Sequence, residues 1–140
     1  MKELDDDLYL EIKELCAKGD ALADEESFPD AIIEYNKAFS LLPEPITEWE
    51  ASTWILTAIA DTYFLANDFE NALQPLIQVM HCPGAIGNAF IHLRLGQVQF
   101  ELGNTERAKD ELARAYMGAG EEIFEDDDPK YLKFIKKFLR

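Results

Sequence analysis

One spacing pattern occurs three times in this chain, and it constrains the fold more than any other feature. Each copy has a small residue in one stretch of helical character and an alanine in the next. The pairs are Gly19 with Ala31, Ala60 with Ala72, and Gly96 with Ala108, and the alanines are separated by 41 and then 36 residues. Small residues at facing positions let two helices approach closely. Helix pairs of similar length in series are typical of a solenoid.

Apolar residues recur at helical spacing through nearly the whole chain, as at Ile32, Tyr35 and Phe39. The alternation of a half-buried strand is absent. Turn compositions such as Ser27-Phe28-Pro29 and Cys82-Pro83-Gly84 divide the chain into segments. We therefore predict an all-α protein, with helices at residues 5–24, 28–41, 47–66, 69–81, 85–102, 105–118, a short one at 120–125, and 129–139.

The three copies also share longer motifs. These are Lys18-Gly19-Asp20-Ala21-Leu22 before Ser27-Phe28-Pro29-Asp30-Ala31, Ile59-Ala60-Asp61-Thr62-Tyr63 before Asp68-Phe69-Glu70-Asn71-Ala72, and Leu95-Gly96 before Leu102-Gly103-Asn104-Thr105-Glu106-Arg107-Ala108. They resemble the tetratricopeptide repeat (TPR), a helix–turn–helix unit of about 34 residues. The third copy departs from the pattern, because Thr105 stands where the others have Phe28 and Phe69.

The resemblance implies an all-α, TPR-like α-solenoid of three helix pairs plus a C-terminal capping helix. We expect one domain over residues 1–140, with repeats at about 10–43, 53–84 and 89–120 and the capping helix at about 129–139. A cap is expected because stacked repeats expose an apolar edge at each end. The last segment fits this role through an apolar stripe at helical spacing, formed by Tyr131, Leu132, Phe134, Ile135, Phe138 and Leu139. The alternative is a cationic helix lying on a membrane.

The ending of the chain carries a second resemblance. The residues Tyr116-Met117-Gly118-Ala119-Gly120-Glu121-Glu122-Ile123-Phe124-Glu125-Asp126, followed by Asp128-Pro129-Lys130-Tyr131, resemble the ending of small stand-alone bacterial TPR proteins. Some of those proteins are immunity proteins of polymorphic toxin systems. The resemblance therefore suggests an immunity protein as one function.

The charge of the chain excludes two classes of partner. It has 13 basic and 28 acidic residues, a net charge of −15. A nucleic-acid binder needs a basic footprint, and an anionic membrane surface also attracts basic proteins. The residues from Pro129 onward contain five basic residues, Arg140 included, and no acidic one, so residues 1–128 carry eight basic and 28 acidic residues, or −20. A protein so charged attracts basic partners by long-range steering.

No targeting signal is recognisable in the sequence. The N-terminus, Met1-Lys2-Glu3-Leu4-Asp5-Asp6-Asp7, is acidic where a secretory signal would be positive and then apolar. No apolar run approaches the roughly 20 residues of a membrane span. Cys16 and Cys82 have no partner pattern and are interpreted as small buried hydrophobic residues. We expect a cytoplasmic location.

The sequence contains few candidates for catalytic or metal-binding residues. His81 and His92 have no second metal ligand three or four positions away, and no glycine-rich phosphate loop is present. The acidic run Asp126-Asp127-Asp128, with Glu121, Glu122 and Glu125, lacks the spaced oxygens and central glycine of a calcium loop. It is interpreted as a solvated linker that pairs with the terminal lysines. We therefore expect no enzyme activity, no cofactor and no metal site.

The TPR resemblance implies that the first helix of each pair lines a concave groove. The exposed groove positions would be Lys13, Cys16, Asp20, Asp24, Trp54, Thr57, Asp61, Phe64, Phe90, Leu93, Gln97 and Phe100. As partner-binding residues we predict Asp20, Asp24, Trp54, Asp61, Phe64, Phe90 and Gln97. The alternative is that half of the aromatic residues belong to the core. The lysine, arginine and asparagine set that clamps a chaperone's C-terminal carboxylate in some TPR proteins is missing, so binding of chaperone tails is disfavoured.

Two functions fit these observations. The first is an immunity-type protein that binds and neutralises a basic toxin domain through an acidic, aromatic groove. The alternative is a general TPR scaffold or co-chaperone that binds a linear peptide. A homodimer is also possible if Trp49, Trp54 and the nearly uncharged stretch 71–93 form an exposed apolar patch. The alternative is that these residues are buried between repeats.

Overall fold

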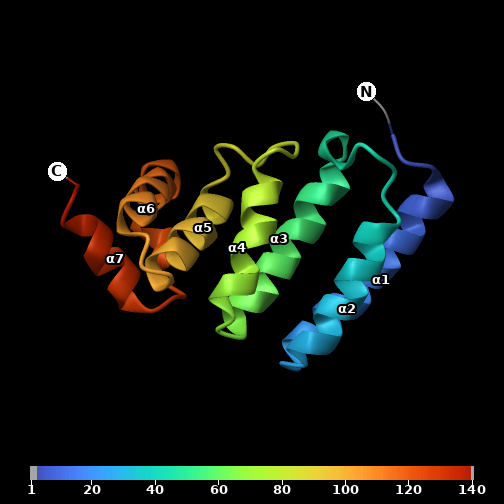
Figure 1. Ribbon diagram of the computed structural model, residues 1–140, viewed down its shortest axis with the longest axis horizontal. Coiled ribbons are helices and arrows are strands. Elements are labelled where there is room, and N and C mark those ends of the chain that lie inside the picture. The colour runs from blue at the N-terminus through green and yellow to red at the C-terminus, as the bar shows by residue number, and fades with distance from the viewer. Residues whose placement is uncertain (1–2, 140) are drawn as a thin grey trace.

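The computed structural model of the protein describes residues 3–139, so Met1, Lys2 and Arg140 lie outside the described part. The described residues form helices and turns and contain no strand. The helices follow one another along the long axis, with α1 and α7 at opposite ends (Figure 1). They are α1 (Asp6–Asp24), α2 (Phe28–Ser40), η1 (Ile46–Glu48), α3 (Glu50–Leu65), α4 (Phe69–Val79), α5 (Ala89–Glu101), α6 (Thr105–Ala119), η2 (Glu121–Phe124) and α7 (Pro129–Lys136).

Close contact between the two helices of a pair depends on the small residues of the repeat. A Cβ added at Gly19 in α1 would lie 2.5 Å from Cε1 of Tyr35 in α2. A Cβ added at Gly96 in α5 would lie 2.7 Å from Cδ2 of Leu112 in α6. Ala60 and the alanines of the second helices are fully buried, namely Ala31, Ala72 and Ala108. The repeated pattern thus sets the spacing inside each pair, as the sequence indicates.

The core runs through the molecule in three connected clusters. Ile12, Tyr35 and Ile55 belong to the cluster between the first pair and α3. Leu76 and Val98 belong to the cluster between the second pair and α5. The third cluster joins the last pair to the end of the chain through Leu93, Leu112, Phe124, Tyr131 and Ile135. The all-α solenoid with a C-terminal cap is therefore confirmed.

Two helix starts differ from the prediction. The expected helix at 85–102 begins at Ala89, because Gly84 and Gly87 have φ values of 73° and 87° and keep the preceding segment in turns. The expected helix at 47–66 is divided into η1 and α3 by Trp49, whose backbone is extended. The indole Nε1–H of Trp49 donates to the Pro43 carbonyl at 2.7 Å and fixes this junction.

The end of the chain folds back over the third pair. Tyr131 and Ile135 in α7 are buried, and Lys130 forms an ion pair with Glu101 at 2.6 Å. Lys136 pairs with Glu121, so lysines of the tail do bind neighbouring acidic residues. Asp128 caps α7 by accepting from the backbone N–H of Lys130 at 2.9 Å. The expected short helix at 120–125 is the 3₁₀ helix η2.

Within residues 3–139, no helix combines the length and apolar character needed to cross a membrane.

Candidate protein-interaction face

The first helices of the three pairs, α1, α3 and α5, form one face, which we call the first-helix face. Trp54 and Asp61 lie two turns apart on the same side of α3. The Trp54 ring contacts Tyr9 of α1, with ring centroids 6.0 Å apart. Asp61 contacts Arg94 of α5. These contacts join the three helices across the face.

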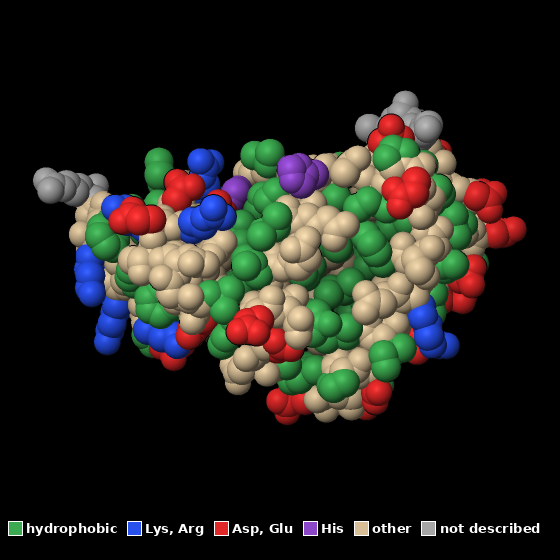
Figure 2. Space-filling view, viewed as in Figure 1, with side chains coloured by type: hydrophobic (Ala, Val, Ile, Leu, Met, Phe, Trp, Pro, Cys, Tyr) green, Lys and Arg blue, Asp and Glu red, His purple; other side chains and the backbone are tan. Residues whose placement is uncertain are grey.

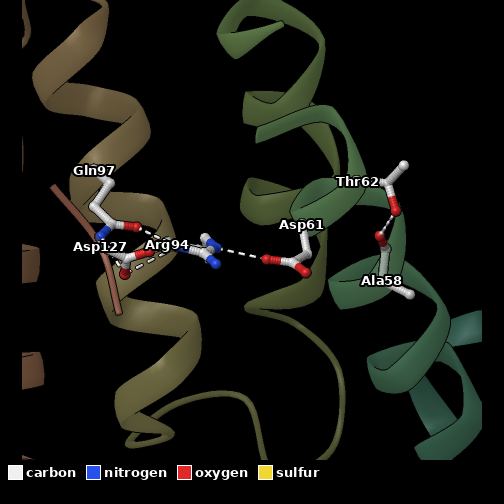
Figure 3. A network of polar contacts seen from close by, with 6 residues as sticks. All are labelled: Ala58, Asp61, Thr62, Arg94, Gln97 and Asp127. Carbon is white, nitrogen blue, oxygen red and sulfur yellow. Dashed lines mark hydrogen bonds and ion pairs between the residues drawn. The ribbon is translucent and has the colours of Figure 1, made fainter. Parts of the chain in front are cut away.

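Arg94 is the centre of the polar network on this face (Figure 3). Its Nε donates to Oδ1 of Asp61 at 2.6 Å, and its Nη1 donates to Oε1 of Gln97 at 2.7 Å. Nη1 also donates to both carboxylate oxygens of Asp127 at 3.3 Å. The Arg94 side chain is only 8% exposed. A charge buried to this degree needs paired carboxylates and hydrogen bonds, and both are present.

Two aromatic rings complete the surroundings of Arg94. Its Cζ lies 4.2 Å from the centroid of Phe64 and 5.1 Å from the centroid of Phe90. A guanidinium over an aromatic face is stabilised by the ring quadrupole. Phe64 and Phe90 therefore bind a cation, and the cation is one of the protein's own residues.

The structure brings four of the seven predicted partner-binding residues together around Arg94: Asp61, Phe64, Phe90 and Gln97. The other three lie apart from this network. Asp20 is exposed and accepts a hydrogen bond from the Tyr35 hydroxyl at 2.6 Å. Asp24 is exposed in the last turn of α1. Trp54 is 44% exposed.

The prediction that Gln97 and Leu93 are exposed in a groove is wrong. Gln97 is fully buried and Leu93 is 1% exposed. The reason is that the chain after α6 returns across α5, where Nε2 of Gln97 donates to Asp127 at 2.9 Å. Tyr131 of α7 then packs between Phe100 and Phe64, with centroids 5.4 and 6.3 Å away. The capping segment therefore occupies the α5 part of the first-helix face.

Sequence reasoning missed Arg94 and Asp127. A signal for Arg94 was present, because it is the only lysine or arginine of α5 and stands between leucines. A buried arginine in such a helix requires an acidic partner. Asp127 gave no signal, because its neighbours Asp126 and Asp128 are also acidic and only the fold distinguishes the three.

Two buried tyrosines have raised pKa values. Burial raises the pKa of Tyr35, and its hydrogen bond to the Asp20 carboxylate raises it further. Burial and the Glu101 carboxylate, 2.7 Å from the hydroxyl, raise the pKa of Tyr131. Burial also raises the thiol pKa of Cys16 and Cys82, so both remain protonated. The neutral Tyr35 and Tyr131 hydroxyls therefore act as hydrogen-bond donors between helices.

His92 is a buried structural residue. The backbone N–H of Gly87 donates to its Nε2 at 3.0 Å, so Nε2 is the acceptor and Nδ1 carries the proton. Nδ1 lies 2.7 Å from Oε2 of Glu111 and donates to it. His92 thereby ties the turn before α5 to α6. Among residues 3–139, no group of three or more histidine, cysteine or acidic side chains is placed to hold a metal ion.

A pocket of about 350 Å³ lies at the α1 end of the face. Leu4, Asp6 and Tyr9 line it from the start of the chain and α1, and Trp49 and Trp54 line it from the start of α3. Glu3 and Glu50 also line it. In the view of Figure 2, acidic side chains are frequent over the α1 end of the molecule, and most of the visible basic side chains lie toward the α6 and α7 end.

Comparison with known proteins gives the fold but no close relative. No protein-family profile matches the sequence, and no curated protein matches it. Among solved structures, the C-terminal TPR-containing domain of a Plasmodium falciparum FK506-binding protein is similar, with a TM-score of 0.74 and 14% identity over 97% of this chain and 91% of that one.

Two further similar structures contain bound partners. The first TPR of Spaghetti bound to an HSP90 peptide has a TM-score of 0.67 and 20% identity, over 91% of this chain and 92% of that one. PcrH in complex with the chaperone binding region of PopB has a TM-score of 0.64 and 13% identity, over 98% and 96%. At these identities the comparisons show the fold alone. The chain thus has the α-solenoid fold of tetratricopeptide repeat proteins.

Proposed function

We propose that this chain is a non-catalytic protein-interaction module that binds a basic protein through the α1 and α3 part of its first-helix face. The observation that carries this proposal is the excess of acidic residues at that end. Residues 3–26 contain ten acidic and two basic residues. The aromatic side chains of Tyr9 and Trp54 stand exposed beside them, at 37% and 44%.

The two kinds of residue have different effects on binding. Acidic side chains attract a basic partner over distance and orient it, which raises the association rate. Exposed aromatic side chains supply contact area, and tryptophan and tyrosine are frequent energetic centres of interfaces. Acidic charge next to exposed aromatic rings therefore favours a basic protein partner.

The partners that acidic residues have within the first-helix face determine which of them can attract a basic protein. The charge of Asp61 is partly compensated by Arg94 at 2.6 Å, so it contributes less to the field at a distance than an unpaired carboxylate does. Within residues 3–139, the hydrogen-bond partner of Asp20 is the neutral Tyr35 hydroxyl, and no cation pairs with this carboxylate. The exposed Asp24 lies one turn further along α1. The acidic residues that attract a basic partner are therefore those of α1. Asp61 instead belongs to the network that holds α3 to α5.

As the narrower proposal, the partner is a basic toxin domain and this chain is its immunity-type protein. The −20 charge of residues 1–128 supports it, because enzymes that act on nucleic acid are basic and an acidic inhibitor uses the same field. The resemblance of residues 116–131 to the ending of small bacterial TPR proteins also supports it.

The second candidate is a scaffold or co-chaperone that binds a linear peptide. Two structures of the same fold support it, since one is bound to an HSP90 peptide and the other is in complex with the chaperone binding region of PopB. The two candidates differ in the ligand, because a short peptide is sufficient for the second.

A salt-dependent capture experiment tests the proposed function. The tagged full chain is incubated with lysate of its own source at low and at high salt, and retained proteins are identified by mass spectrometry. We expect a basic protein that is retained at low salt and lost at high salt. Asp20→Asn with Asp24→Asn should reduce its retention, whereas Asp30→Asn with Glu70→Gln, which removes two exposed charges from α2 and α4, should not. Retention of acidic proteins alone would contradict the proposal.

A further inference from the structure

The pocket at the α1 end of the first-helix face has the properties of a receptor for one cationic side chain. We propose that it receives an arginine of the basic partner, whose guanidinium lies on the Trp54 ring and pairs with the carboxylates around it. This inference rests on the proposed function and adds the place and the chemical group that the partner contributes. A lysine is a weaker occupant of the same pocket, because arginine is planar and stacks on aromatic faces.

Hydrogen bonds fix the part of the pocket lining that Trp49 provides. Trp49 is 7% exposed, and its indole N–H is bonded to the Pro43 carbonyl at 2.7 Å. One turn of chain away, the Ser52 hydroxyl donates to the Ile46 carbonyl at 2.6 Å. These bonds fix the junction between η1 and α3, where Trp49 lines the pocket. A pocket formed before binding avoids the entropy cost of ordering its walls.

The pocket lining also includes two exposed aromatic rings. Tyr9 and Trp54 pack edge to face, with an interplanar angle of 62°. Lys13 lies one turn along α1, with its Nζ 5.3 Å from the Tyr9 ring centroid. The face therefore already holds one cation against an aromatic ring at the border of the pocket. Among aromatic side chains, tryptophan forms the strongest cation–π interactions, so Trp54 is well suited to bind a cation.

Charge complementarity decides the occupant. Glu3, Asp6 and Glu50 are exposed where they line the pocket, and within residues 3–139 its lining includes no lysine or arginine. Leu4 and Ala51 add apolar surface beside the rings. An occupant that matches both surfaces has an apolar stem and a cationic head, which describes arginine and lysine side chains. Acidic or phosphorylated segments would be repelled.

The test is an NMR titration of the full-length, ¹⁵N-labelled chain with the peptide acetyl-Gly-Arg-Gly-amide. The chain has two tryptophans, so it gives two indole signals. We expect the peptide to shift the signal of Trp54 and to leave that of Trp49, which is bonded internally. The lysine peptide should bind about threefold more weakly than the arginine peptide, and the norleucine and glutamate peptides should produce no shift.

Two variants test the residues of the pocket. Trp54→Leu and Glu50→Gln should each weaken binding of the arginine peptide by about twofold to fivefold. The matched controls are Phe138→Leu, an exposed aromatic residue just after α7, and Glu70→Gln, an exposed acidic residue of α4. Both should bind as the unmodified chain does. Amide spectra confirm that each variant is folded.

The outcomes separate this inference from the proposed function. The inference is overturned if the arginine peptide leaves the Trp54 signal unmoved, or if the peptide binds both pocket variants as tightly as the unmodified chain. This holds even if the full chain captures a basic partner. Peptide binding at Trp54 without any captured basic protein supports the pocket and contradicts the proposed function. A Trp54 signal that moves on dilution of the chain alone would assign the pocket to a second copy of the protein and overturn the inference.

Discussion

Arg94 of α5 donates from Nε to Asp61 of α3 at 2.6 Å, and this bond joins the third helix pair to the second. The same guanidinium binds Asp127, which lies beyond α6. One side chain thus connects two neighbouring repeats and the returning end of the chain. The Arg94 side chain is 8% exposed, so the network forms part of the core as much as of the surface.

Removing Arg94 should destabilise the fold strongly. Arg94→Met keeps most of the volume but leaves the Asp127 carboxylate, whose side chain is 14% exposed, without its cation. Loss of one partner of a buried pair costs about 3 kcal/mol of the free energy of unfolding. Urea unfolding followed by circular dichroism measures this change.

A second substitution provides the control for Arg94. Asp127→Asn combined with Arg94→Met removes the more buried of the two carboxylates that lose their cation, so the double variant should recover part of the lost stability. The two substitutions should therefore be non-additive. Equal stability of Arg94→Met and the unmodified chain would show that the network contributes nothing to the fold.

Asp127 should hold the C-terminal segment in place. Asp127→Ala removes its bonds to Arg94 and Gln97 and should cost about 1.5–3 kcal/mol, the usual effect of a hydrogen bond to a charged group. Amide hydrogen exchange should become faster in α7 than in α1. Asp126→Ala is the matched control, because Asp126 is exposed next to it. Equal exchange rates in the two variants would contradict this role.

The fold was predictable because its signals are local. The small residues Gly19 and Gly96 meet Tyr35 and Leu112 at the expected close approaches. Caps and turns stand beside the helices they end, as when Asp68 accepts from the backbone N–H of Asn71 at 3.3 Å. Such signals need only nearby residues, so one sequence is sufficient to read them.

The candidate site was predictable only in part, because its central contacts are distant in sequence. Asp61 and Arg94 are 33 residues apart, as are Arg94 and Asp127. The neighbouring residues Asp126, Asp127 and Asp128 have the same side chain and different surroundings: solvent, the buried guanidinium, and the start of α7. No pattern within the run distinguishes them. Burial of Gln97 follows from the same contact and was missed for the same reason.

Glycine replacements should have opposite effects at two sites. Gly96→Ala places a Cβ 2.7 Å from Leu112 side-chain atoms and 3.0 Å from its backbone nitrogen, and should cost about 1–3 kcal/mol by overpacking. Gly118→Ala, within α6, meets only Ala89 at 3.4 Å. It should stabilise the protein by about 0.5–1 kcal/mol through helix propensity. Thermal unfolding of both variants measures the difference, and two changes of the same sign would contradict the packing account.

The free energy of unfolding should fall at alkaline pH. The pKa values of Tyr35 and Tyr131 are raised above the unfolded value of 10.0, so their neutral hydroxyls stabilise the folded state. This stability is complete below pH 10 and is lost as the pH rises above it, by up to about 1.4 kcal/mol per group and pH unit. Urea midpoints at pH 9 and 11 measure the loss. Replacing both tyrosines by phenylalanine should make the decline shallower, and an unchanged decline would assign it to other groups.

The association rate with the captured basic partner tests the central claim most directly. Stopped-flow measurements at low and high salt compare the unmodified chain with the Asp20→Asn, Asp24→Asn variant and the Asp30→Asn, Glu70→Gln control. We predict that at low salt the first variant associates about tenfold more slowly than the control, and that high salt removes the difference. Equal rates for the two variants at low salt would contradict the claim that the acidic α1 face steers a basic protein to this chain.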